Sequence, residues 1–255
     1  MRIHAPSAAL APFVREFMIV DVHEETTRLR LPEPGLVLGV RYRGSASVFT
    51  GDTVAPLPDV SLAAVSATAR RMRTSAGGGV VLARFHPGGA GQFFAQPLHE
   101  LFGATVALDQ LLPRDQVDRI QSDVARAAGD RERVAALEAF LLARLRPGAP
   151  DPVVAAALGA LREARGAVRI AALARRLGIS QDPLEKRFRR VVGASPKQLA
   201  SLLRLRHAID SYRPGAPLTR LAQDAGYFDQ SHFNREFRAV TGQAPGRFLR
   251  AGAHR

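Results

Sequence analysis

Residues 218–248, LTRLAQDAGYFDQSHFNREFRAVTGQAPGRF, decide the fold of the C-terminal part of the chain, because the same pattern occurs once before. The second copy carries Leu221, Ala222, Gly226, Phe233, Phe237, Arg238, Gly242, Pro245 and Phe248. The first copy carries Leu173, Ala174, Gly178, Leu184, Phe188, Arg189, Gly193, Pro196 and Leu199. The offset is 48 residues before the turn and 49 after it, so the second turn is one residue longer. Each copy predicts a helix-turn-helix, and two such modules fit a repetitive partner, duplex DNA.

Local chemistry supports both turns. Gly178 and Gly226 end the first helix of each pair, where a left-handed backbone costs glycine little. Ser180 and Asp229 align as N-caps, and each is expected to offer a side-chain oxygen to the first amides of the next helix. We therefore interpret Asp229 as a cap rather than as a residue that reads bases.

Each second helix has an apolar face and a polar face. Residues at i, i+4 and i+7 are expected to form the core: Leu184, Phe188 and Val191, and likewise Phe233, Phe237 and Val240. The polar residues are the candidates for DNA binding: Gln181, Asp182, Glu185, Lys186, Arg189, Arg190, Gln230, Ser231, Asn234, Arg235 and Arg238. Those near the helix start reach base edges and those further along reach phosphate. A solvated helix face is the competing explanation for any single position.

These residues resemble the AraC/XylS-type bacterial transcription regulators. The resemblance covers roughly residues 153–250 and is most specific over Ala225–Phe248. It implies a DNA-binding domain with two helix-turn-helix motifs joined by the expected helix Pro196–Ser211. It also implies a base-contacting role for Arg235 and for the aligned Lys186, where the family commonly has arginine. Arg235 can fork onto guanine O6 and N7, whereas Lys186 offers a point charge.

Three other residues of the second helices are interpreted separately. Glu185 either contacts a base or orients Lys186, since a carboxylate can accept from cytosine N4 but repels phosphate. Asp182 is favoured as a charge that complements the helix macrodipole. His232 either faces the groove or packs against its helix neighbours.

Charge is concentrated on the repeated half. Residues 151–255 hold 19 basic and 8 acidic side chains, a net of +11, whereas residues 1–150 hold 17 and 15, a net of +2. A basic surface gains affinity for DNA by releasing counterions from phosphates. General solubility would not explain the asymmetry.

Upstream of the repeat the chain reads as α+β. Strands are expected within Phe13–His23, Leu36–Phe49, Ser61–Arg73 and Val80–His86, followed by helices at Arg114–Ala128 and Arg131–Leu145. The proline-rich stretch 147–152 is the expected linker. We therefore expect a β-rich sensor or dimerisation domain closed by a helical pair (1–146) and an all-α DNA-binding domain (153–255).

The N-terminal domain carries weaker functional signals. Polar residues on its expected strands are the candidates to line a ligand pocket: Arg41, Tyr42, Arg43, Arg84 and His86. Surface positions on strands explain them equally well. The Val80–Phe94 segment looks like a strand-and-turn passage of some AraC-type N-terminal domains. Its Gly88–Gly91 turn lacks the spacing of a dinucleotide loop, so a plain turn is expected.

The sequence predicts a transcription regulator that is not an enzyme and uses no cofactor or metal. It has no cysteine, no metal-ligand spacing among its histidines and no nucleophile elbow. An enzyme or metal-binding β-domain tethered to a DNA-binding module is the alternative. Without a signal segment or a long apolar run, a cytoplasmic protein with no membrane contact is expected. The expected partners are duplex DNA, a small-molecule effector, RNA polymerase and a second copy of the chain.

Overall fold

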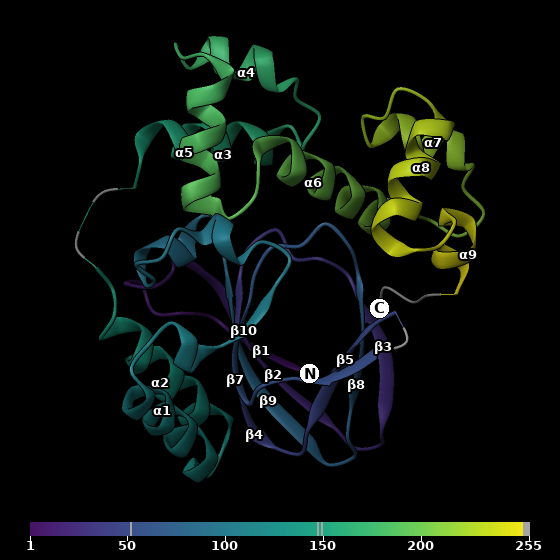
Figure 1. Ribbon diagram of the computed structural model, residues 1–255. Coiled ribbons are helices and arrows are strands. Elements are labelled where there is room, and N and C mark those ends of the chain that lie inside the picture. Colours follow the sequence, from purple (N-terminus) through teal and green to yellow (C-terminus); the bar gives the residue numbers. More distant parts are fainter. Residues whose placement is uncertain (52, 147, 149, 252–255) are drawn as a thin grey trace.

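The computed structural model describes residues 1–51, 53–146, 148 and 150–251 (Figure 1). Of the expected linker, Pro147 and Ala149 lie outside the described residues, and so do residues 252–255 of the expected C-terminal domain. A β-rich N-terminal part is followed by a helical C-terminal part. This arrangement confirms the fold class predicted from the sequence.

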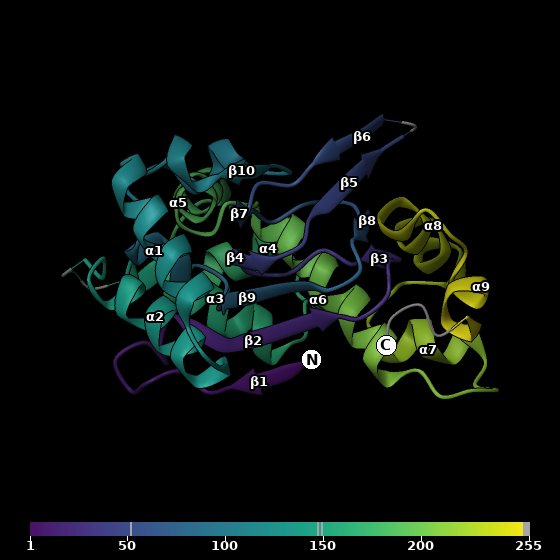
Figure 2. The same cartoon turned by 90° about the horizontal axis from the view of Figure 1, so that it is seen from below.

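The N-terminal part contains two antiparallel sheets. Its strands are β1 (Arg2–His4), β2 (Val14–Val22), β3 (Thr26–Arg30), β4 (Val37–Arg43), β5 (Ala46–Thr50), β6 (Thr53–Pro56), β7 (Val60–Ala63), β8 (Arg70–Thr74), β9 (Gly78–Phe85) and β10 (Thr105–Ala107). One sheet has the order β1-β2-β9-β4-β7-β10 and the other β3-β8-β5-β6. Figure 2 shows the β5–β6 hairpin extending beyond the other strands.

Side chains of the six-stranded sheet point alternately to two faces: a packed face that forms the apolar core, and a face that lines a cavity. In β2, Phe17 and Ile19 are buried in the apolar core, while Met18 between them lines a cavity. In β4, Val40 belongs to the core and the next residue, Arg41, lines the same cavity. This period of two is the ordinary geometry of a strand. It gives the sheet two chemically different faces.

A helical pair covers the packed face (Figure 1). Three short 3-10 turns, η1 (Gly89–Gln92), η2 (Leu98–Leu101) and η3 (Leu108–Gln110), lead to α1 (Arg114–Arg126) and α2 (Asp130–Leu142). The two helices contribute buried residues to the core at helical spacing: Val117, Ile120, Val124, Val134, Leu137 and Leu141. The expected helical pair is therefore present.

The C-terminal part is helical throughout its described length. Its helices are α3 (Pro152–Glu163), α4 (Ile170–Arg176), α5 (Gln181–Val192), α6 (Pro196–Ser211), α7 (Leu218–Asp224), α8 (Gln230–Thr241) and α9 (Pro245–Arg250). They enclose two apolar cores, and α6 contributes Leu199 to the first and Leu205 to the second. Figure 1 shows α6 running between the α3–α5 group and the α7–α9 group. Within the described part of the chain, no helix combines the length and hydrophobicity needed to cross a membrane.

Some expected strands have different bounds in the structure. The expected strand Leu36–Phe49 is two strands, β4 and β5, because Gly44 turns the chain with a φ of +69°. The expected strand Ser61–Arg73 is likewise two, β7 and β8, which lie in different sheets. Strands β1, β3, β6 and β10 were not expected, since short segments rich in Thr and Arg carry little apolar alternation.

The N-terminal and C-terminal parts pack against each other. Leu202 of α6 and Ala194 belong to the N-terminal core, and Leu29 and Leu31 pack against the second helical core. The backbone amide of Ala69 also donates to the carbonyl of Val240, at the end of α8, over 2.7 Å. The β-rich part therefore contacts both helix-turn-helix modules.

Candidate nucleic-acid interface and cavity

The turn of the first module has the expected backbone but not the expected cap. Gly178 has a φ of +71°, and Ser180 occupies the N-cap position of α5. The Ser180 side chain accepts no hydrogen bond from the helix, so the predicted capping oxygen is wrong. Pro183 explains the difference, because it occupies the third helical position and has no N–H to donate.

The second module has both predicted features. Gly226 has a φ of +79°. Asp229 is the N-cap of α8, and its Oδ1 accepts from the backbone amide of His232 over 2.6 Å. The interpretation of Asp229 as a cap is confirmed. The start of α8 is therefore held by a charged cap that α5 lacks.

The predicted core residues lie inside. Leu184, Phe188, Phe233 and Phe237 are fully buried. The two valines, Val191 and Val240, are half-buried and pack against the same cores. Phe237 contacts Phe233 edge-on with ring centroids 5.4 Å apart. These contacts fix which face of each helix points outward.

Most of the polar candidates lie on that outward face. The exposed members of the set are Gln181, Asp182, Lys186, Arg189, Arg190, Ser231, Arg235 and Arg238. Glu185, Gln230 and Asn234 are half-buried. The Oδ1 of Asn234 is shielded from solvent without a hydrogen bond among the described residues. Asn234 is therefore turned further inward than its neighbour Arg235.

Several polar side chains are held by contacts within the modules. Glu185 accepts from Gln181 Nε2 over 3.2 Å and lies 3.7 Å from Arg189. The side-chain partners of Glu185 are therefore Gln181 and Arg189, and not Lys186, which it was expected to orient. Gln230 Oε1 accepts from Thr219 of α7 over 2.6 Å.

His232 adopts the packed alternative. Its ring meets Tyr227 edge-on at 5.5 Å, and its Nε2 lies 3.6 Å from Glu236. Glu236 in turn accepts from Arg204 and Ser201 of α6. Burial raises the pKa of the Tyr227 hydroxyl, and the negative Glu236 raises it further. This cluster fixes α8 on α6.

Two cations at equivalent positions are free to meet a partner. Among the described residues, Lys186 and Arg235 make no side-chain hydrogen bond or ion pair, and both are exposed. Each lies in the first half of its helix, 49 residues from the other in sequence. The opposite ends of the two helices touch the β-rich part, at Gly193 beside Leu98 and at Val240 beside Ala69.

Comparison with known families agrees with this geometry. Residues 173–251 match a helix-turn-helix domain family, and residues 2–107 match a domain of unknown function (DUF6597). Putative AraC-like transcription regulators from Streptomyces antibioticus and Streptomyces lividans are each 35% identical over 101 residues. That stretch is 39% of this chain and 33% of each relative, so the match spans about a third of their length.

The C-terminal part is an AraC-type helix-turn-helix domain. Among solved structures, ToxT from Vibrio cholerae is similar in fold, with a TM-score of 0.48 and 12% identity. The match covers 91% of this chain and 97% of the ToxT chain.

A cavity of about 690 Å³ lies between the two sheets of the β-rich part. Its wall is largely apolar, with side chains including Met18, Val20, Val48, Met72 and Leu82. Arg206 of the AraC-type domain also lines it, so the cavity reaches the contact between the two parts of the chain. Within the described residues, no group of three His, Asp or Glu could hold a metal ion.

Two of the predicted ligand residues, Arg41 and Arg84, line this cavity. Arg41 is only 6% exposed, and its Nε lies 3.4 Å from Asp59 Oδ1 without a hydrogen bond among the described residues. Burial lowers the pKa of the Arg41 guanidinium, and the nearby Asp59 opposes this. The guanidinium of Arg84, by contrast, has two carboxylate partners: it donates to Glu16 over 2.5 Å and to Glu33 over 2.6 Å.

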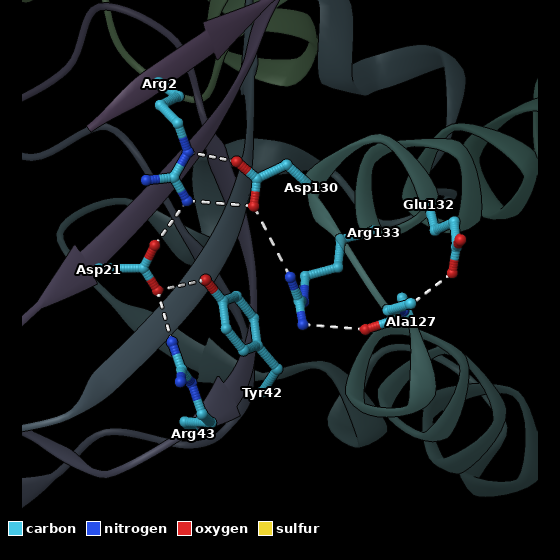
Figure 3. A network of polar contacts seen from close by, with 9 residues as sticks. Arg2, Asp21, Tyr42, Arg43, Ala127, Asp130, Glu132 and Arg133 are labelled. Atoms are coloured by element: carbon cyan, nitrogen blue, oxygen red, sulfur yellow. Dashed lines mark hydrogen bonds and ion pairs between the residues drawn. The ribbon is translucent and has the colours of Figure 1, made fainter.

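Tyr42 and Arg43 lie elsewhere, which differs from the expectation that they share a pocket with Arg41. Tyr42 follows Arg41 and therefore points to the other face of β4. It donates to Asp21 over 2.7 Å and faces the Arg133 guanidinium of α2, while Arg43 also donates to Asp21 (Figure 3). Desolvation raises the pKa of Asp21, but the hydrogen bonds from Arg2, Tyr42 and Arg43 outweigh it and lower the value to about 2.

His86, the fifth candidate, lines a second cavity of about 900 Å³ between the β-rich part and the AraC-type domain. Burial lowers its pKa, and the positive charges of Arg15 and Arg162 lower it further. Arg190 of α5 lines the same cavity. His86 and Arg41 are therefore in different sites.

The cavity wall also contains charged residues that the sequence did not predict, among them Glu33, Asp59 and Arg206. Glu33 and Asp59 lie beside strands rather than in them, and Arg206 lies on a helix of the other part of the chain. A buried charge needs a partner, so Arg41 and Arg84 on an apolar strand were the available signal that acidic residues must lie near.

Proposed function

We propose that this protein is a DNA-binding transcription regulator whose helices α5 and α8 enter successive segments of the major groove. The observation that carries the proposal is the equivalent placement of Lys186 and Arg235. Both are exposed, both lie early in a helix that follows a turn, and neither is held by the side chain of another described residue. The proposed domains are residues 1–146, a linker at 147–152 and residues 153–255.

The proposed roles follow the position of each side chain along its helix. Lys186, Arg235, Gln181 and Ser231 are nearest to base edges, while Arg189, Arg190 and Arg238 are nearer to phosphate. Glu185 acts on DNA together with Arg189, with which it pairs. We give Gln230 and Asn234 a smaller share, since both are half-buried. Asp182 remains a charge at the start of its helix.

The signal proposed for this regulator is a small molecule in the cavity between the sheets. The cavity volume and its largely apolar wall suit a ligand of modest size. Arg41 supports this assignment, because the Nε of its buried guanidinium donates no hydrogen bond to any described residue. RNA polymerase and a second copy of the chain, bound through residues 1–146, complete the proposed partners.

Footprinting of the full chain on a duplex selected from random sequence tests the proposal. One monomer with two recognition helices should protect roughly two helical turns, about 20 base pairs, without palindromic symmetry. Affinity should fall steeply as salt rises, because several phosphates are neutralised. Protection of a few base pairs only, or affinity independent of salt, would contradict it.

A further inference from the structure

The second helix-turn-helix carries an extra residue, and the hydrogen bonds identify it. Before the insertion the two turns match: the amide of Ile179 donates to Ala174 over 3.2 Å, and the amide of Tyr227 donates to Ala222 over 3.0 Å. After it they match again, since Leu184 donates to Ser180 and Phe233 to Asp229. The residue left over between these two sets is Phe228.

Phe228 differs in its surroundings from the other aromatic residues of the second module. Its side chain is 92% exposed, whereas Tyr227 beside it is 5% exposed. Among the described residues its ring makes no aromatic or cation-π contact, although Tyr227, Phe233, Phe237 and Phe248 are all stacked edge-on. The ring therefore contributes almost nothing to the folded state.

The position of Phe228 matters more than its exposure, since single apolar residues on a surface are common. It directly precedes Asp229, the residue that caps α8. The next residues along the chain, Gln230 and Ser231, begin the helix that presents Arg235. If α8 enters the major groove of DNA with its N-terminal end, the ring of Phe228 lies at the edge of that groove.

The apolar feature that a major groove offers to such a ring is the 5-methyl group of thymine. We infer that Phe228 contacts a thymine methyl group in the DNA segment that α8 enters. The inference rests on the proposed function, and it deepens it by adding an apolar contact to the polar ones. The first module has no counterpart of Phe228, so the two half-sites are read by different chemistry and only the α8 half-site requires this thymine.

Replacement of thymine by uracil tests the contact, because uracil lacks only the methyl group. The full chain and its Phe228→Ala variant are titrated with the selected duplex and with duplexes in which each thymine is replaced in turn. Leu142→Ala, which removes a 41% exposed apolar side chain on α2, is the matched control. Thermal unfolding of each variant verifies that it is folded.

The parent chain should lose about fourfold in affinity at one thymine of the α8 half-site, the effect of one methyl group removed from an apolar contact. Phe228→Ala should bind the parent duplex more weakly by at least that factor and no longer distinguish thymine from uracil there. Phe228→Leu should keep part of the discrimination. Leu142→Ala should behave as the parent chain.

Equal sensitivity to uracil in the parent chain and in Phe228→Ala would overturn the inference, and so would no effect at any thymine. Unchanged DNA affinity with altered sedimentation of Phe228→Ala would overturn it in favour of a protein partner. In these cases Arg235→Ala still weakens binding, so the proposed function stands. Loss of all sequence preference in the parent chain would overturn both.

Discussion

Arg206 of α6 and Glu33 of the β-rich part lie 2.9 Å apart, Nη2 to Oε1. The same guanidinium donates to the carbonyl of Pro32 over 2.7 Å. Glu33 also accepts from Arg84 of the cavity wall over 2.6 Å. One carboxylate therefore joins an arginine of the cavity to an arginine on the helix between the two DNA-binding modules.

Glu33→Gln should lower the free energy of unfolding by about 1–3 kcal/mol at neutral pH, because the guanidinium groups of Arg84, Arg206 and Arg15 lose a charged partner. Burial raises the pKa of Glu33, but Arg206 and Arg84 outweigh it and hold the pKa below the ordinary 4.5. The contribution is complete above that ordinary value and is lost as pH falls through the lower folded value.

Urea unfolding of the parent chain and of Glu33→Gln at neutral pH and at pH about 3 measures the difference. The difference in free energy of unfolding between the parent chain and Glu33→Gln should be smaller at the acidic pH. Glu25→Gln, at an exposed position, is the control. A gap of the same size at both pH values would contradict the ion-pair account.

The two N-caps should respond differently to alanine. Asp229→Ala should cost about 1 kcal/mol, because the His232 amide loses its acceptor. Ser180→Ala should cost almost nothing, since its side chain caps no amide and Pro183 has none to offer. Chemical denaturation of both variants provides the comparison, and equal losses would refute the assignment of caps.

Arg41 and Arg84 should also behave differently. Arg84→Met should destabilise the protein by about 1–3 kcal/mol, because Glu16 and Glu33 each lose a half-buried charged partner. Arg41→Met should be close to neutral, since its guanidinium is desolvated and incompletely bonded. Thermal unfolding measures both. A large loss for Arg41→Met would show that this arginine serves stability rather than a ligand.

Arg238 lies further along α8 than Arg235 and is proposed to contact phosphate. Arg238→Ala should weaken binding to all duplexes alike and reduce the slope of log affinity against log salt by about one unit. Titrations at several salt concentrations, on selected and on unrelated duplexes, give this slope. An effect confined to one sequence would assign Arg238 to a base instead.

The helix-turn-helix modules were predictable because their turns and cores depend on residues close together in the chain. Gly178, Gly226 and Asp229 each act within four residues of their own position. The prediction that Ser180 caps α5 was wrong, because Pro183 lacks the N–H that a serine cap at this position would bind. A prediction of N-caps therefore has to consider the third residue of the helix as well as the capping residue itself.

The cavity was less predictable, because a single residue of register decides which face a strand side chain joins. Arg41 and Tyr42 are adjacent, yet one lines the cavity and the other packs towards α2. Glu33 and Arg206 meet only through the packing of the two parts of the chain. The spacing of residues in the sequence does not predict such a contact.

The most direct test of the central claim is the affinity and base preference of Arg235→Ala on the selected duplex. The account predicts a loss of about 1–3 kcal/mol and relaxed discrimination at one base pair, because a forked guanidinium on a guanine edge is removed. Arg131→Ala, which removes an exposed positive charge on α2, should leave both unchanged. Unaltered affinity and base preference in a folded Arg235→Ala protein would contradict the placement of α8 in the major groove.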